Sequence, residues 1–79
     1  MRIDKYLKVS RIIKRRTVAA EACDGGRVTV NGKTVKPAYD VKIGDVITVQ
    51  FGAKSVSVEV VSLNESAGKA DAAGLYREV

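Results

Sequence analysis

The sequence predicts an α+β fold in which two short N-terminal helices pack on a small, twisted antiparallel sheet of about four strands, followed by a short C-terminal helix. Helical spacing of apolar residues near the N-terminus and alternating apolar residues further along the chain predict these elements. The 79 residues are sufficient for one small domain but not for a deep substrate cleft. We expect residues 1–63 to form the domain with its sheet and residues 64–79 to form a tail that contains the last helix.

The first helix is expected to end near Ser10. Ile3, Tyr6 and Leu7 recur at a spacing that places them on one helical face, where they can be buried. The basic residues of the same segment centre on the opposite face: Arg2, Lys5 and Lys8. Such a short helix is not stable alone, so it must pack on another element.

The second helix is expected to follow a tight basic connection, SRIIKRR. Thr17 is a candidate N-cap for the run VAAEACD, and Glu21 adds a negative charge to its early turns. Gly25 and Gly26 follow the run and predict a left-handed helix stop.

The strands follow the second helix. Residues 27–36 alternate around Asn31-Gly32, which is typical of a hairpin with a type I′ turn, and Pro37 ends the returning strand. In the next strand, one face is formed by Ile47, Val49 and Phe51. The last strand turns a second apolar row inward: Val56, Val58 and Val60. A weak helical pattern in the tail is expected to dock through Leu75 and Tyr76.

The positive charge is concentrated at the N-terminus. Residues 1–16 contain seven Lys and Arg against one acid, whereas residues 17–79 contain seven Lys and Arg against eight acids. The net charge of +5 therefore arises from the first fifth of the chain. This asymmetry predicts a polyanionic partner.

The sequence argues against an enzyme, a cofactor and a metal site. It contains no His, so the usual general base and metal ligand is missing. Asp40 and Asp45 are separated by a turn and have the character of turn-forming acids. The single cysteine, Cys23, cannot form an internal disulfide, which fits a reducing cytoplasm. Its expected role is that of a small buried helix residue.

The N-terminal two thirds of the chain resembles the S4 domain, a family of RNA-binding modules. The resemblance rests on an ordered set of motifs over residues 1–51: RIDKYL, the S-R and R-R-T that lead into the second helix, GRVTVNG and VKIGDVITV. It implies an S4-like fold with its αL motif. The sequence is most similar to the stand-alone branch that acts in ribosome-associated quality control, and is related to the fifteen-kilodalton heat-shock branch.

The resemblance implies a specific role in the cytoplasm. Such a protein binds ribosomal RNA and peptidyl-tRNA on an obstructed large ribosomal subunit. It holds the tRNA in the P site while a quality-control elongation factor on the same subunit directs C-terminal alanine tailing. It is expected to be a monomer when free, with no membrane partner.

Candidate RNA-binding residues follow from the basic helical face, the connection after it and the hairpin. They are Arg2, Lys5, Lys8, Arg11, Lys14, Arg15, Arg16, Arg27 and Lys33. Arg is suited to bidentate phosphate contacts, and Lys acts as a point charge. Asp4 is expected to orient a neighbouring Arg or to cap the first helix, and Arg16 is expected at the surface. With one Phe and three Tyr, the chain lacks the aromatic ladder of a single-strand binder.

Three alternatives stay open at this point. In the first, residues 2–13 lie in the interface of a bilayer as a peripheral membrane module. In the second, an exposed sheet edge recruits a protein partner. In the third, the chain is a general heat-shock-type RNA binder that recycles ribosomes.

Overall fold

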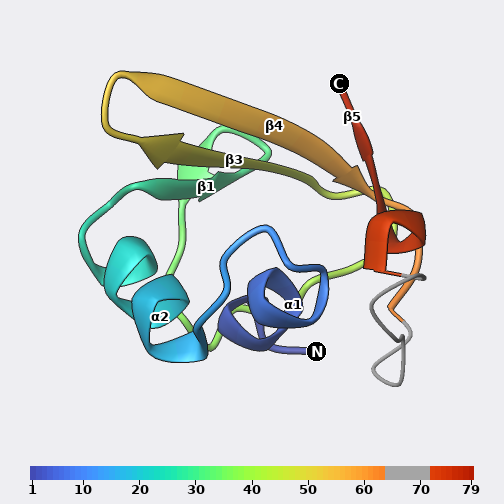
Figure 1. The fold of residues 1–79 in the computed structure, drawn as a ribbon, viewed down its shortest axis with the longest axis horizontal. Coiled ribbons are helices and arrows are strands. Elements are labelled where there is room, and N and C mark those ends of the chain that lie inside the picture. The colour runs from blue at the N-terminus through green and yellow to red at the C-terminus, as the bar shows by residue number, and fades with distance from the viewer. Residues whose placement is uncertain (64–71) are drawn as a thin grey trace.

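A computed structural model describes residues 1–63 and 72–79, which form two layers (Figure 1). The helices α1 (Ile3–Val9) and α2 (Arg16–Asp24) lie on one side of an antiparallel sheet. The described part of this sheet has five strands in the order β2-β1-β3-β4-β5. Their bounds are β1 (Val28–Val30), β2 (Lys33–Thr34), β3 (Val46–Phe51), β4 (Lys54–Val60) and β5 (Tyr76–Glu78). The predicted α+β class is confirmed, with one strand more than expected.

The core lies between the two layers. The predicted apolar face of α1 is fully used, because Ile3, Tyr6 and Leu7 have no exposed surface. Opposite them lie buried side chains of α2 and of the strands: Ala19, Ala22, Cys23, Val28, Val30, Ile47, Val49, Val58 and Val60. Burial of each large aliphatic side chain contributes about 1.5–3 kcal/mol. The short helices are therefore stabilised by packing on the sheet.

The N-terminus of α1 is capped by a distant loop. The backbone N–H of Ile3 donates to the carbonyl oxygen of Tyr39 at 2.8 Å, and the N–H of Asp4 donates to that of Pro37 at 3.3 Å. These bonds satisfy donors that the helix itself leaves unpaired. They also tie α1 to the loop between β2 and β3.

Helix α2 begins at Arg16, two residues earlier than expected, so the predicted Thr17 N-cap is wrong. Arg15 is the extended residue before the helix, and its carbonyl oxygen accepts from the N–H of Ala19 at 3.1 Å. Thr17 is therefore already inside the first turn. The predicted stop is confirmed, since Gly26 has φ +75° and the next N–H bonds back to the carbonyl oxygen of Ala22 at 2.9 Å.

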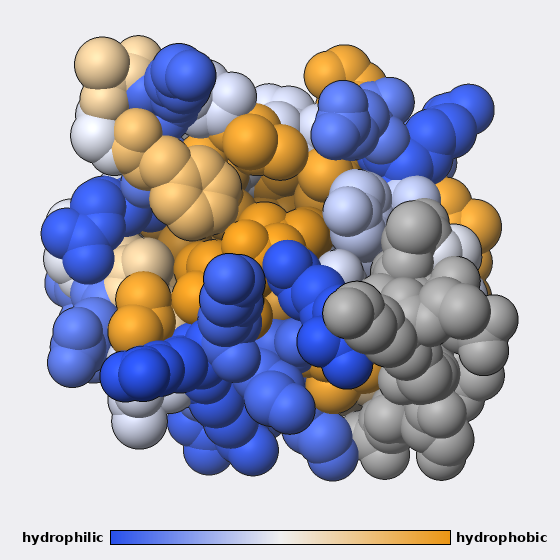
Figure 2. All heavy atoms as spheres, viewed as in Figure 1, coloured by the Kyte–Doolittle hydropathy of each residue, from blue (hydrophilic) through white to orange (hydrophobic). Residues whose placement is uncertain are grey.

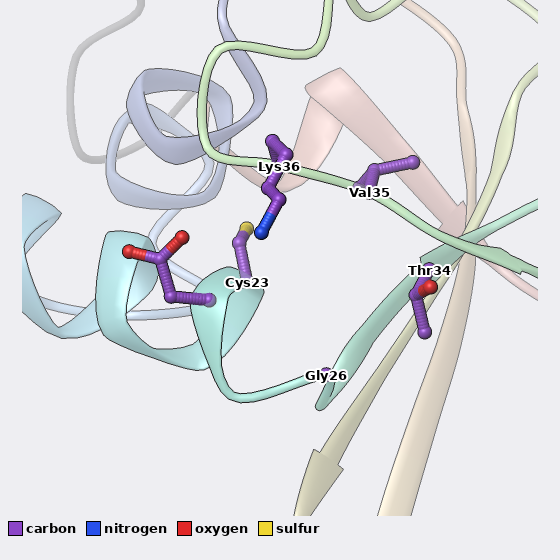
Figure 3. Close-up of a pocket in the computed structure, with 6 residues that line it drawn as sticks. Cys23, Gly26, Thr34, Val35 and Lys36 are labelled. Atoms are coloured by element: carbon purple, nitrogen blue, oxygen red, sulfur yellow. The ribbon is translucent and has the colours of Figure 1, made fainter.

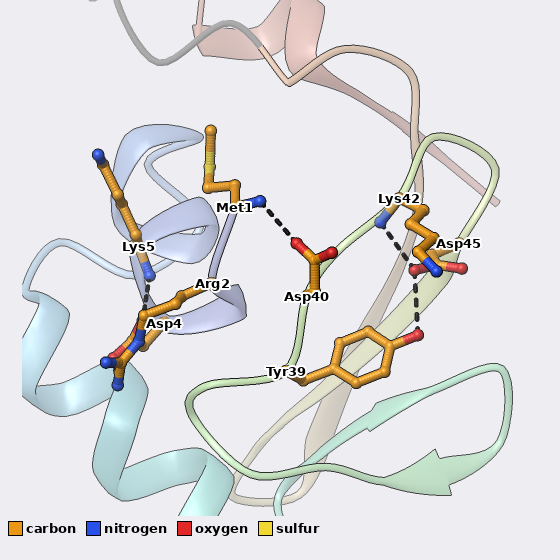
Figure 4. A network of polar contacts seen from close by, with 8 residues as sticks. All are labelled: Met1, Arg2, Asp4, Lys5, Tyr39, Asp40, Lys42 and Asp45. Carbon is orange, nitrogen blue, oxygen red and sulfur yellow. Dashed lines mark hydrogen bonds and ion pairs between the residues drawn. The ribbon is translucent and has the colours of Figure 1, made fainter.

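The β1–β2 hairpin has the predicted type I′ geometry, with φ values of 52° at Asn31 and 86° at Gly32. Asn31 is also a structural link, because its Oδ1 accepts from the N–H of Val46 at 3.0 Å. Its Nδ2 donates to Asp45 Oδ1 at 3.2 Å. Asp45 in turn accepts from the Tyr39 hydroxyl at 3.3 Å, as Figure 4 shows. Asp45 is thus a turn-organising acid, as its position in the sequence predicts.

The C-terminal end differs most from expectation. A helix was expected in the tail, but residues 64–71 lie outside the described part, and residues Ala72–Leu75 form a single 3-10 turn. The chain then pairs with β4 as the additional strand, with Tyr76 opposite Val60. The long strand β4 has an otherwise unpaired edge, and this pairing satisfies part of it. Leu75 docks in the core as predicted, at 2% exposure.

Tyr6 joins the two ends of the chain. Its hydroxyl donates to the carbonyl oxygen of Leu75 at 2.6 Å, across 69 positions of sequence. Burial, and then the neighbouring Tyr76, raise the pKa of Tyr6 to about 12. The hydroxyl therefore stays protonated and able to donate at neutral pH.

Candidate nucleic-acid interface

The N-terminal cations lie along one continuous stretch of the chain in the helical layer. They come from α1, from the connecting residues 10–15, which we call the elbow, and from the start of α2. Six are exposed and Lys5 is half-buried. We define the basic face by these residues: Arg2, Lys5, Lys8, Arg11, Lys14, Arg15 and Arg16. Hydrophilic side chains gather over the helical layer in Figure 2.

Asp4 is the one acid of this segment, and it is buried at 3% exposure. Arg2 binds it in bidentate geometry, with Nε 3.2 Å from Oδ1 and a terminal nitrogen 3.1 Å from Oδ2 (Figure 4). Arg16 reaches the same carboxylate from α2, with a terminal nitrogen 3.4 Å from Oδ1. The prediction that Asp4 orients a neighbouring Arg is confirmed, and the carboxylate orients a second one as well.

These two arginines remain accessible. The side chain of Arg2 is 53% exposed and that of Arg16 is 47% exposed. Because both are open to solvent, each ion pair contributes at most about 1 kcal/mol to stability. A guanidinium has five N–H donors, so donors that Asp4 does not use can bind phosphate. Asp4 therefore orients two guanidinium groups that keep donors open to solvent.

The elbow has a fixed backbone. Ser10 is buried, and the N–H of Ile13 donates to the carbonyl oxygen of Leu7 at 3.1 Å. Arg11 lies between them with φ 64°, a left-handed conformation that costs a non-glycine residue about 1–2 kcal/mol. Arg11, Lys14 and Arg15 form no ion pair with any described residue. All three are exposed, so their charges face solvent.

Arg27 and Lys33 lie apart from Asp4. Arg27 follows the C-terminal stop of α2, and Lys33 begins β2 at the edge of the sheet. Both are exposed, and neither forms an ion pair with a residue that the structure describes. The structure therefore brings Arg2 and Arg16 together at Asp4, keeps the other five N-terminal cations on α1 and the elbow, and places Arg27 and Lys33 on other elements.

Within residues 1–63 and 72–79, no group of three or more His, Cys, Asp or Glu could hold a metal ion. Cys23 lies on the wall of a 140 Å³ pocket together with Lys36 (Figure 3). Burial, followed by the charges of Asp4 and Asp24, raises the pKa of Cys23 to about 11. Its thiol is therefore protonated at neutral pH and is a poor nucleophile. No described helix is both long and apolar enough to cross a bilayer.

Two features of this region are not apparent from the sequence. The first is the shared contact of Arg2 and Arg16 with Asp4, because that contact needs α1 and α2 to pack. The sequence feature that could have indicated this contact is the single acid among seven cations in residues 1–16. The second is the left-handed conformation of Arg11, since neither Gly nor Asn marks that position.

Comparisons with known proteins agree with this fold. The family model described as "S4 domain" matches residues 1–47. A Streptococcus pneumoniae protein named "RQC P-site tRNA stabilizing factor" is 54% identical over 76 residues, which cover 96% of this chain and 86% of the relative. The Bacillus subtilis protein of the same name is 53% identical, with 96% and 88% covered.

A solved structure gives the same result. The heat shock protein 15 of Vibrio cholerae, described as trimeric, superimposes with a TM-score of 0.91 at 34% identity. The match covers 100% of this chain and 81% of that one. The family model covers more than half of the chain. The fold of heat shock protein 15 matches the whole chain. The chain therefore belongs to the S4 domain family.

Proposed function

We propose that this chain is an RNA-binding protein of the large ribosomal subunit. It contacts ribosomal RNA and peptidyl-tRNA on obstructed subunits and stabilises the P-site tRNA during ribosome-associated quality control. The basic face carries this proposal, because seven cations there share a single acid, and that acid is buried. The name of the relatives that are 53–54% identical supports the tRNA part of the role.

The geometry of the basic face suits structured RNA. Such RNA is recognised mostly through its shape, its phosphates and its 2′-hydroxyls. A fixed elbow and two carboxylate-oriented arginines present cations on a rigid surface rather than on a flexible tail. A rigid surface binds with a smaller loss of side-chain entropy.

The role requires partners rather than chemistry of its own. In this proposal, the bound chain holds the tRNA while a quality-control elongation factor on the same subunit directs alanine tailing. The chain acts as a cytoplasmic monomer that becomes part of the subunit complex. It needs no catalytic group, metal ion or cofactor for this task.

A heat-shock-type recycling role is the second candidate. The TM-score of 0.91 with heat shock protein 15 favours it. The two roles differ in their products, because alanine tails on stalled chains require the quality-control factor. Deletion of the gene should abolish these tails under the first proposal and leave them intact under the second.

The membrane alternative loses its main support. A bilayer would need Ile3, Tyr6 and Leu7, and all three are completely buried. The sheet-edge alternative makes a separate prediction. Ribosome association that survives RNase but is lost when the β5 edge is blocked would favour it over RNA binding.

The salt dependence of RNA binding tests the electrostatic account. If the basic face contacts five phosphates, affinity should fall about 500-fold between 50 and 200 mM salt, with a slope of about −0.9 per phosphate. Lys42→Ala serves as a control, since Lys42 is exposed but lies in the loop before β3. It should leave the slope unchanged. A flat salt response of the unmodified protein would contradict the proposal.

A further inference from the structure

An apolar groove opens at the end of the sheet next to the elbow. Its volume is about 340 Å³, and it lies between α2, β3 and the turn after β3. Phe51 and Val18 line it, and each is 44% exposed. Apolar surface is visible between the sheet and the helices in Figure 2. Two large apolar side chains in one groove form a patch rather than isolated exposed residues.

Phe51 is exposed because β3 extends past the helical layer. It lies on the same sheet face as Ile47 and Val49, which are 0% and 1% exposed. In the strand pairing it sits opposite Lys54, at the last position before the hairpin turn. The fold therefore leaves one aromatic ring on the core side of the sheet with an accessible face.

The groove carries groups that bind nucleobases. Phe51 offers a ring for stacking, and Arg27 offers a planar cation. The Arg27 guanidinium packs beside Gly25. A Cβ atom added to Gly25 would lie 3.5 Å from Arg27 Cζ. RNA-binding proteins stack unpaired bases on aromatic rings and on guanidinium planes. Among the described lining residues, Arg27 carries the only charge.

The groove is continuous with the basic face. Ile13 lines it from the elbow, and the exposed cations Lys14 and Arg15 follow directly in the chain. A phosphate bound at the elbow would therefore bring the attached nucleotide to the mouth of the groove. Positive charge on both sides matches an RNA strand better than it matches an apolar protein segment.

We propose that this groove binds one unpaired nucleobase, extruded from the RNA whose phosphates lie on the basic face. The base stacks on Phe51, and Arg27 holds a phosphate or a base edge beside it. The inference rests on the proposed RNA-binding function and adds one contact to it. It gives the chain a preference for RNA with a bulged nucleotide or a splayed loop.

The test compares two RNA hairpins, one fully paired and one with a single bulged 2-aminopurine. We expect the bulged hairpin to bind more tightly, with a change in fluorescence as the base enters the groove. Phe51→Ala should weaken binding of the bulged hairpin about tenfold, in line with measured costs of losing one stacking partner. It should change binding of the paired hairpin less than twofold. Ile43→Ala is the matched control, because Ile43 is 67% exposed in the turn before β3, and it should have no effect.

Other outcomes separate the two proposals. Equal binding of both hairpins, unaffected by Phe51→Ala, overturns the base pocket and leaves the basic face intact. Failure to bind either hairpin or ribosomal RNA overturns RNA binding itself. If Phe51→Ala weakens binding to the large subunit but to neither hairpin, the groove receives a protein side chain and the base pocket is wrong.

Discussion

Arg2 and Arg16 are held by a buried carboxylate, whereas Arg11, Lys14 and Arg15 project from the elbow without an acidic partner among the described residues. The first pair is oriented before RNA arrives. Ordering a long side chain on binding costs about 0.5–1.5 kcal/mol, so pre-ordered arginines add more affinity than free ones. The elbow cations contribute mainly through counterion release. Cations of equal charge are therefore expected to contribute unequally to RNA affinity.

The largest effect is expected from Arg16→Ala, measured beside Arg15→Ala. At 100 mM salt the loss of one phosphate contact weakens binding up to about eightfold, which is the expectation for Arg15→Ala. Arg16→Ala also removes a pre-ordered group, so we expect a loss of about twentyfold in a filter-binding or anisotropy assay. Its unfolding free energy should fall by less than about 1 kcal/mol, because the ion pair is half exposed. Equal losses of RNA affinity for the two variants would show that orientation by Asp4 adds nothing to binding.

The next largest effect is expected from Asp4→Asn. Removal of a negative charge from a basic face predicts tighter RNA binding if total charge alone matters. We expect the opposite, a loss of about tenfold, because two arginines lose their orientation. Urea unfolding should show a decrease of about 1–2 kcal/mol, since bonds to a charged group are lost. Tighter binding by Asp4→Asn would contradict the account.

The smallest effect is expected from Arg11→Gly. Arg11 has a left-handed backbone, and glycine adopts this conformation without steric cost. Unfolding free energy should rise by about 0.5–1 kcal/mol, while RNA binding weakens no more than for Arg15→Ala. Arg11→Ala is the matched control, because it removes the charge and keeps the strain. A fall in stability with glycine would show that the Arg11 side chain supports the fold.

Local patterns predicted much of this structure. The Asn31-Gly32 turn, the Gly26 stop and the apolar face of α1 each depend on a few neighbouring residues, and all are confirmed. The expectation of a polyanionic partner also rests on the sequence, because charge asymmetry needs no coordinates.

Long-range contacts decided the features that the sequence did not predict. Strand β5 exists because the edge of β4 accepts it, and Tyr6 reaches Leu75 across the whole chain. Asp4 joins two helices, and its double contact with Arg2 and Arg16 requires their packing. Such contacts leave no periodic signal in the sequence.

Sucrose-gradient sedimentation of cell lysates tests the central claim most directly. We expect the protein to comigrate with free large ribosomal subunits, and Arg16→Ala to shift it towards the top of the gradient. Lys42→Ala should sediment like the unmodified protein. Comigration with small subunits, or absence from both subunit peaks, would contradict the assignment to the large subunit.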